Sequence, residues 1–324
     1  MKKRDVSFDI LKGILIYLVV LGHSISFLEG ENCWRNTLFN SIYIFHMPLF
    51  IFVSGYFYYP SAFCKTDFIK KKAIRLLVPW FYWSSLTLVI TFCLFDISIS
   101  NGYDLLDLIF RTYTSYWYLI CLFVLSILFY PVVNIGKVQS YCWLSGLLVV
   151  LFVFSLIYWD FVPYPIFKNC QVIRQVIPFA LGLAYFKYGE KFNNYLKWCI
   201  VAFMIVFMAL LWVKWGFWIS AYCEYQKILS NSPSLIVAFA ILISLSKRIS
   251  SNIVGAVISW IGKYSLSIYL LHVFLFFVAR RLSPSFSYSI LNALLLSLIM
   301  MIMSVLVIMA HKLLLGKKSQ YIGL

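Results

Sequence analysis

Ten apolar stretches, separated by short polar segments, run along the chain and predict membrane-spanning helices. A helix needs about 20 apolar residues to cross about 30 Å of hydrocarbon, and most of the stretches reach that length. Two of them are shorter, at 172–187 and 233–246, so we expect tilted or kinked helices there. The ten stretches lie at about 10–28, 38–58, 76–95, 116–135, 141–159, 172–187, 198–218, 233–246, 254–279 and 287–311.

The predicted fold class is therefore all-α, a polytopic integral membrane helical bundle of about ten transmembrane helices. The loops between the stretches are short, which leaves no room for a second soluble domain. We expect a single transmembrane domain over residues 1–324, with no appended soluble domain.

The composition supports a membrane protein. Of the 324 residues, 63% are apolar and 12% are charged, whereas a soluble domain is about 45–50% apolar and about 25% charged. One water-soluble core cannot bury so much apolar surface. The composition therefore excludes a soluble enzyme, a disordered chain and a nucleic-acid-binding protein.

The net charge of +16 has a topological explanation. Ten spans put both termini on one side of the membrane, and 17 of the 27 basic residues then lie on that side, against seven in the opposite loops. Because cytoplasmic loops carry the excess of Lys and Arg, we expect both termini in the cytoplasm and a multi-pass protein of the inner (plasma) membrane. The charge is then evidence for a lipid bilayer as partner and not for nucleic acid.

The eight cysteines form no CxxC pair and have no histidine at metal-ligand spacing. No metal site is predicted from them. Cys33, Cys170 and Cys223 fall on predicted external loops, where a disulfide stays possible.

The first span carries a polar stripe. Lys12 and His23 are eleven residues apart, about three helical turns, so both lie on one face, roughly 16 Å apart along the axis. Asp9 lies close to the same face. Ionisable groups within the hydrocarbon are rare and mark functional sites, so we expect a lined path from the cytoplasmic edge past the midplane. The alternative for Lys12 is an ammonium that extends to the cytoplasmic surface.

Two further histidines lie in the second and ninth spans. His46 is about eight residues, and His272 about seven, from the outer end of its span. Together with His23 they are predicted at a similar depth, roughly 7–12 Å below the external surface. Neutral imidazole is a suitable general base near neutral pH, so these three are the candidate catalytic residues. A proton relay in a transporter and an incidental hydrogen-bond network are the alternatives.

Other polar and aromatic residues lie near the ends of spans. Lys72 and Arg75 precede the third span and share a helix face. They either enforce the topology or bind an anion, and the guanidinium of Arg75 suits a phosphate. Trp117 and the tyrosines around it form an interface belt or stack on a sugar ring. Arg174, at the outer entrance of the sixth span, contacts a substrate or extends to the interface.

Several motifs occur together in a fixed order along the chain. They are Arg4-Asp5-x3-Asp9-x2-Lys12-Gly13, the Lys12-x10-His23 spacing, Phe45-His46-Met47-Pro48-Leu49-Phe50 with Ser54-Gly55, the run from Arg75 to Trp80, Trp117-Tyr118-Leu119, Gly182 after Pro178-Phe179, and Ser265-Leu266-Ser267-Ile268-Tyr269-Leu270-Leu271-His272. With this set the chain resembles the membrane acyltransferase 3 family over nearly its whole length, most closely the sugar O-acetylase branch of fucose 4-O-acetylase-like proteins. That family often shows Arg-x-x-Arg before the third span. Here the first position is Lys72, which keeps a charge contact but not a bidentate one.

The resemblance implies an O-acyltransferase that moves an acyl group, usually acetyl, from acyl-coenzyme A to a hydroxyl of a cell-surface or lipid-linked saccharide. Acetyl-CoA would be a co-substrate, and no permanently bound cofactor is implied. His23 would act as the base or be acylated transiently, and His46 or His272 would orient the acceptor or stabilise the oxyanion. The expected binding residues are Lys12, Lys72 and Arg75 for the anionic coenzyme A, and Asp9, Trp117 and Arg174 for the saccharide.

The main alternative function is a secondary transporter or flippase for a lipid-linked saccharide. Intramembrane polar residues and ten spans suit it equally well, but it is expected to have pseudo-symmetric halves, and we find no internal repeat. A polysaccharide polymerase would have large external loops, and the loops here are modest. The acceptor, the acyl group and the oligomeric state stay open at this point.

Overall fold

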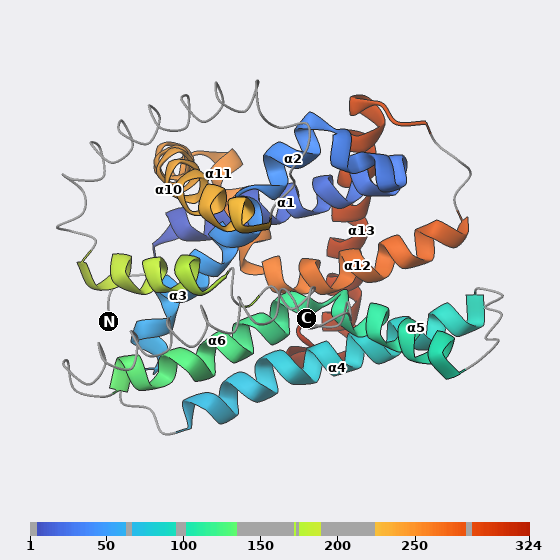
Figure 1. The fold of residues 1–324 in the computed structure, drawn as a ribbon, viewed down its shortest axis with the longest axis horizontal. Helices are drawn as coiled ribbons and strands as arrows, with labels where there is room; N and C mark the ends of the chain where they lie inside the picture. Colours follow the sequence, from blue (N-terminus) through green and yellow to red (C-terminus); the bar gives the residue numbers. More distant parts are fainter. Residues whose placement is uncertain are drawn as a thin grey trace. The chain divides into compact units, whose positions relative to one another are not determined.

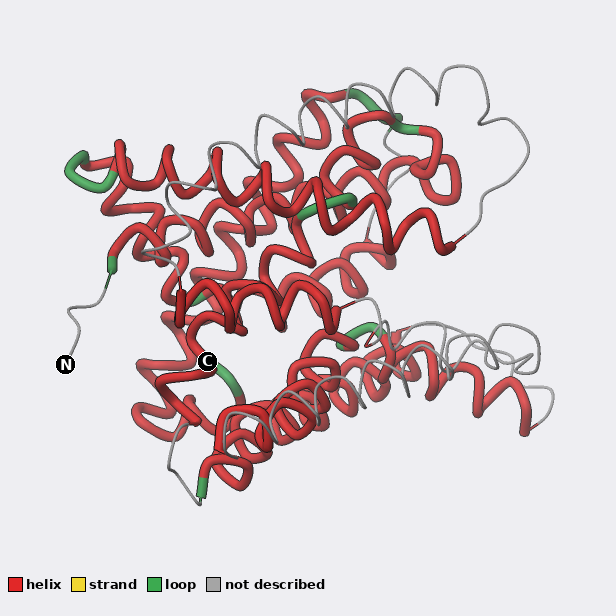
Figure 2. Tube along the Cα trace, turned by 60° about the vertical axis from the view of Figure 1, so that its left-hand side comes forward, coloured by secondary structure: helices red, strands yellow, loops and turns green. Residues whose placement is uncertain are grey.

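The computed structural model describes residues 5–62, 67–94, 102–134, 172, 175–188, 224–282 and 287–324. Within these ranges every regular element is an α-helix or a 3-10 helix, and none is a strand (Figures 1 and 2). The predicted all-α fold class is therefore confirmed for the described part of the chain.

The helices fall into two compact units. Unit 1 comprises Met1–Phe57, Ile177–Ser265 and Phe286–Met301, and unit 2 comprises Tyr58–Val176, Leu266–Ser285 and Ile302–Leu324. The helices of unit 1 are α1 (Val6–Glu29), η1 (Gly30–Arg35), α2 (Thr37–Tyr43), most of α3 (His46–Ala62), α10 (Glu224–Ile249) and α11 (Ile253–Lys263). Those of unit 2 are α4 (Phe68–Leu94), α5 (Gly102–Thr114), α6 (Trp117–Asn134), α12 (Ser265–Leu282) and η2 (Gly316–Ile322), while α13 (Ile290–Leu315) contributes to both.

Within the described ranges, five helices are long and apolar enough to cross a membrane, or six spans if one bent pair counts as a single span. The five are Val6–Arg35, Thr37–Tyr59, Phe68–Cys93, Trp117–Asn134 and Ile290–Leu314, and the pair is Ile253–Lys263 with Ser265–Arg280. The two short stretches are helical, as 175–188 and α10, but are not in this set. The stretches at 141–159 and 198–218 lie outside the described residues, so the count of ten stays a prediction.

One predicted span is broken. The sequence predicted a continuous helix over 254–279, but α11 and α12 meet at an angle of 71° around Tyr264. Tyr264 has φ −101° and ψ 13°, outside the helical range. Gly262, two residues before Tyr264, packs directly against a neighbouring helix.

That contact is a direct backbone approach between α1 and α11 in unit 1. A Cβ atom at Gly262 would collide with the carbonyl oxygen of Asp9, and one at Gly13 would collide with that of Ile258. Small residues permit such close approach between membrane helices. The two glycines thus hold the beginning of α1, including Asp9, against α11.

A second close crossing in unit 1 joins α3 to the helical segment 177–188. Gly55 faces the carbonyl oxygen of Phe179, and Gly182 faces that of Phe52, each too closely for a Cβ atom. Both glycines belong to motifs that carry the family resemblance. The structure accounts for them by packing.

We expect Gly182→Ala to destabilise the protein by about 1–3 kcal/mol, the usual range for overfilling a packed interior. The new Cβ would collide with backbone atoms of Phe52 and Tyr56, which cannot rotate away as a side chain can. Thermal unfolding in detergent measures the effect. Gly102→Ala is the control, because no atom lies within 4 Å of a Cβ at that position. Equal stability of the two variants would contradict the close crossing.

In unit 2, α4 is the long helix on which α5 and α6 pack (Figure 1). The indole N–H of Trp80 donates to the carbonyl of Tyr113 (3.2 Å), and the Tyr113 hydroxyl pairs with that of Ser85 (2.9 Å). The hydroxyls of Tyr116 and Thr87 lie 3.0 Å apart. Two tyrosines from the predicted aromatic belt therefore bind α5 and the start of α6 to α4.

The residues that follow α13 pack onto α4 and α12. The indole N–H of Trp83 donates to the carbonyl of Ile322 (2.9 Å), and the hydroxyl of Ser267 donates to that of Gly323 (2.7 Å). Gly323 has φ +82°, which favours glycine, and it lies against Leu270. Since Trp83 and Ser267 are both buried, this segment satisfies two donors that would otherwise destabilise unit 2.

Candidate active site

The candidate site lies where α1, η1 and α2 form a helical hairpin in unit 1. α1 ends at Glu29, and the next residue, Gly30, has a φ of +58°, which glycine adopts far more readily than other residues. Asn36 then caps α2, since its Oδ1 accepts the N–H of Phe39 (3.0 Å) while its Nδ2 donates to the carboxylate of Glu29 (3.1 Å). These local contacts turn the chain so that α2 packs against α1.

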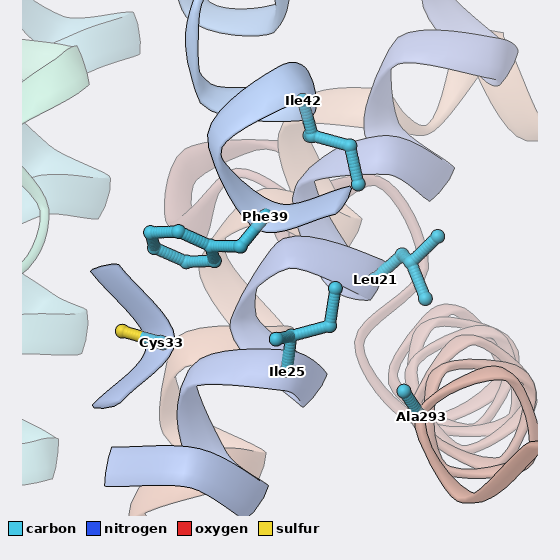
Figure 3. Packing of buried hydrophobic residues seen from close by; sticks show 6 residues of the cluster. All are labelled: Leu21, Ile25, Cys33, Phe39, Ile42 and Ala293. Carbon is cyan, nitrogen blue, oxygen red and sulfur yellow. The ribbon is translucent and has the colours of Figure 1, made fainter. Parts of the chain in front are cut away.

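A buried apolar cluster holds this hairpin together (Figure 3). No member is more than 5% exposed, and Tyr43 packs against the cluster. The thiol of Cys33 is a member and is in no disulfide. Cys170 and Cys223, its predicted candidate partners, lie outside the described residues. The members come from α1, η1, α2 and α13 and are Leu21, Ile25, Cys33, Phe39, Ile42 and Ala293.

The chain breaks its helix between α2 and α3, at residues 44–45. Pro48, which has no N–H to donate, lies in the first turn of α3, where proline is tolerated. At the break, Nδ1 of His46 lies 2.7 Å from the carbonyl oxygen of Ile42. A carbonyl only accepts, so Nδ1 carries the hydrogen, and in the neutral ring Nε2 is the basic nitrogen.

Tyr43 contacts both predicted histidines of unit 1. Its ring is edge-on to the imidazoles, with centroid distances of 4.8 Å to His46 and 6.4 Å to His23. Gly22 leaves space for it, since a Cβ there would lie 2.8 Å from the Tyr43 ring. The structure thus brings His23 and His46 to one place, with His46 only 2% exposed and His23 more accessible.

Asp9 and Lys12, predicted to bind different substrates, form an ion pair with each other. The ammonium lies 2.8 Å from the carboxylate, and the side chains are 22% (Lys12) and 4% (Asp9) exposed. The ammonium also lies 5.5 Å from the centroid of the Phe57 ring. Because the carboxylate offsets its charge, Lys12 in this state is a weaker ligand for a phosphate than a lone lysine.

His272 lies in unit 2, on α12, and is fully buried. Its Nδ1 is 3.0 Å from the carbonyl oxygen of Ile268, so its neutral form has the same tautomer as His46. Its ring contacts those of Tyr269 (5.5 Å) and Phe276 (6.4 Å). A single depth for the three histidines stays a prediction.

The remaining predicted binding residues of unit 2 lie on α4 and α6. The ammonium of Lys72 lies 5.6 Å from the centroid of the Phe68 ring, and Arg75, three residues further along α4, is exposed. Trp117 begins α6 and is half-exposed. Arg174 lies outside the described residues.

Tyr43 is the residue of this site that sequence reasoning missed. It is one of 23 tyrosines and carries no charge that would make it stand out in an apolar span. The available signal was its place three residues before His46 and two residues before the Phe45–Phe50 motif begins. As for metals, no cluster of His, Cys, Asp and Glu fit to hold an ion occurs among the described residues.

Known proteins similar to this chain include two bacterial nodulation proteins named NolL. The chain is 28% identical over 223 residues to the protein from Mesorhizobium japonicum, and 36% identical over 123 residues to that from Sinorhizobium fredii. The first match covers 66% of this chain and 57% of the relative, and the second covers 36% and 33%. The matched region is thus at most 57% of the length of either relative.

No solved structure matches the chain. A family match, by contrast, covers most of it. The sequence pattern of Acyl_transf_3, described as an acyltransferase domain, extends over residues 5–312. This match confirms the resemblance predicted from the motifs, and the chain therefore belongs to the Acyl_transf_3 family of acyltransferases.

Proposed function

We propose that the protein is an integral membrane acyltransferase that moves an acetyl group from acetyl-CoA to a hydroxyl of a cell-surface or lipid-linked saccharide. Its family supports acyl transfer, and its apolar helices support a membrane enzyme. The acetyl group and the saccharide come from the sequence motifs of the sugar O-acetylase branch. Acetyl-CoA is a co-substrate and not a resident cofactor.

The observation that carries the proposal is the pair of imidazoles around Tyr43. His23, the more accessible one, removes the proton of the acceptor hydroxyl while the oxygen attacks the thioester carbonyl. The tetrahedral intermediate then collapses, the C–S bond breaks, and the coenzyme A thiolate leaves and takes the proton from the His23 imidazolium, which restores the neutral base. Neutral His46 can only accept a hydrogen bond at Nε2, because its N–H is held by Ile42. It therefore orients the saccharide by accepting from a neighbouring hydroxyl, one that keeps its proton, whereas stabilising an oxyanion would require the protonated form of His46.

We assign the phosphates of coenzyme A to Lys72 and Arg75. Both lie in the first turns of α4, which the distribution of basic residues favours as cytoplasmic, and the exposed guanidinium of Arg75 suits a phosphate. Lys12 contributes as a pair with Asp9 and not as a separate phosphate ligand. Trp117 and Arg174 remain the proposed saccharide-binding residues, and His272 a further candidate in unit 2.

The same distribution of basic residues supports the membrane topology that the proposal requires. We propose that the chain crosses the inner membrane ten times and that both termini lie in the cytoplasm. The basic cytoplasmic side then faces the compartment that supplies anionic acyl-CoA.

Transfer of labelled acetyl groups tests the proposed reaction. Purified protein in proteoliposomes would receive acetyl-CoA labelled in the acetyl group, with a lipid-linked saccharide extract as acceptor. We expect label in the saccharide and an equal amount of released coenzyme A. Movement of the saccharide across the bilayer without consumption of acetyl-CoA would instead identify a flippase and refute the proposal.

A further inference from the structure

The ring of Tyr43 makes edge-on contacts with both imidazoles of the candidate site. It meets His46 at a centroid distance of 4.8 Å and an interplanar angle of 65°, and His23 at 6.4 Å and 67°. Edge-on contacts of this kind restrict how far each imidazole can rotate. One aromatic side chain therefore restrains both candidate catalytic rings.

Tyr43 is itself held in place from several sides. Its ring stacks on that of Phe39 at 3.9 Å and meets the edge of Trp34 at 6.2 Å. Gly22 lets it approach α1 directly beside His23, since a Cβ at Gly22 would intrude on the ring. Close packing of this kind leaves few alternative rotamers, so Tyr43 forms a fixed wall rather than a mobile gate.

Tyr43 and His46 lie on either side of the break between α2 and α3, three residues apart. Tyr43 is the last residue of α2 and His46 the first of α3. The hydrogen bond from His46 Nδ1 to Ile42 fixes one edge of the imidazole (2.7 Å), and the Tyr43 ring contacts it from another direction. Two constraints thus define the orientation of His46.

We propose that Tyr43 is a positioning residue whose ring sets the mutual arrangement of His23 and His46. This inference rests on the proposed acyl transfer by that pair. The ring positions the two imidazoles by direct contact, and the hydroxyl takes no part in the reaction. Misplacement of a reacting group by about 1 Å lowers an enzymatic rate by up to about 10²-fold, so loss of the ring acts on kcat.

Two substitutions separate the ring from the hydroxyl. We expect Tyr43→Leu to lower kcat by about 10–100-fold, with KM changed by less than about threefold, because the rings lose their fixed orientation. Tyr43→Phe keeps the ring and is expected to retain kcat within about threefold. Leu21→Ala is the matched control, since Leu21 belongs to the same apolar cluster but is not a ring neighbour of the histidines. It should lower thermal stability and leave kcat unchanged.

A second measurement does not depend on activity. The chain has only four histidines, so the NMR spectrum of the histidine-labelled protein in nanodiscs can be assigned with single His→Asn variants. We expect Tyr43→Leu to shift the imidazole resonances of His23 and His46 and to leave that of His311 in place. Tyr43→Phe should leave all of them close to their wild-type positions.

The outcomes distinguish this inference from the proposed function. A wild-type protein that transfers no acyl group would refute the proposed function, and the NMR shifts would still decide whether Tyr43 orients the two rings. Unchanged kcat in Tyr43→Leu, with active wild type, would overturn the positioning role alone. So would a Tyr43→Phe variant as slow as Tyr43→Leu, because the hydroxyl would then take part in the reaction.

Discussion

His23→Ala is expected to slow acyl transfer by about 10²–10⁴-fold, the range for loss of a general acid–base group. His23 is the more accessible of the two imidazoles at Tyr43, so it is the one placed to reach a substrate hydroxyl. The rate is measured as coenzyme A release in membranes that contain equal amounts of correctly inserted protein. Stability should change little, because the ring is only half-buried.

The control for this substitution is His311→Ala. His311 lies near the end of α13, and its Nδ1 is 3.1 Å from the carbonyl oxygen of Val307, a geometry like that of His46, but outside the candidate site. Its removal should leave the rate within about threefold of wild type, well short of the loss expected for a general base. Undiminished transfer by His23→Ala would rule out His23 as the base.

Asp9→Asn is expected to destabilise the protein by about 3 kcal/mol, the lower end of the cost of breaking a buried ion pair from one side. The substitution leaves the Lys12 ammonium in a largely buried place without its carboxylate. The lower end applies because Lys12 is still 22% exposed. Unfolding in detergent, by heat or denaturant, measures the change.

Two further variants make this prediction specific. Asp9→Asn combined with Lys12→Met removes both charges and should recover most of the lost stability. Asp107→Asn breaks the exposed pair with Arg111 (2.6 Å), whose side chains are 48% and 78% exposed, and should cost less than about 1 kcal/mol. If the double variant lost as much unfolding free energy as the two single substitutions added together, the Asp9–Lys12 pair would contribute no coupling energy.

Much of the helical architecture follows from hydropathy alone, because lipid requires backbone groups to be satisfied within each span. The first span is one continuous helix that holds Lys12 and His23, as predicted. The breaks are harder to predict. Pro48 is visible in the sequence, but it lies within α3, and no residue type marks the break at residues 44–45. The helix α5 was not predicted from the sequence, because the charged residues Asp104, Asp107 and Arg111 interrupt its apolar pattern.

The candidate site shows a similar limit. The spacing of Asp9 and Lys12 allows an ion pair on one helix face, yet the sequence prediction gave them different substrates, since chemical type alone does not reveal a partner. Tyr43 was missed because its role depends on a neighbour in another helix. The space beside it comes from Gly22, which gives no chemical signal of its own.

The most direct test of acyl transfer to a saccharide is the mass of the cell's own glycans. The gene would be deleted, then restored as wild type or as His23→Ala, and surface and lipid-linked glycans compared by mass spectrometry. The proposed function predicts loss of one acyl mass on deletion, its return with wild type, and its continued absence with His23→Ala. A glycan profile that is the same in all four strains would contradict it.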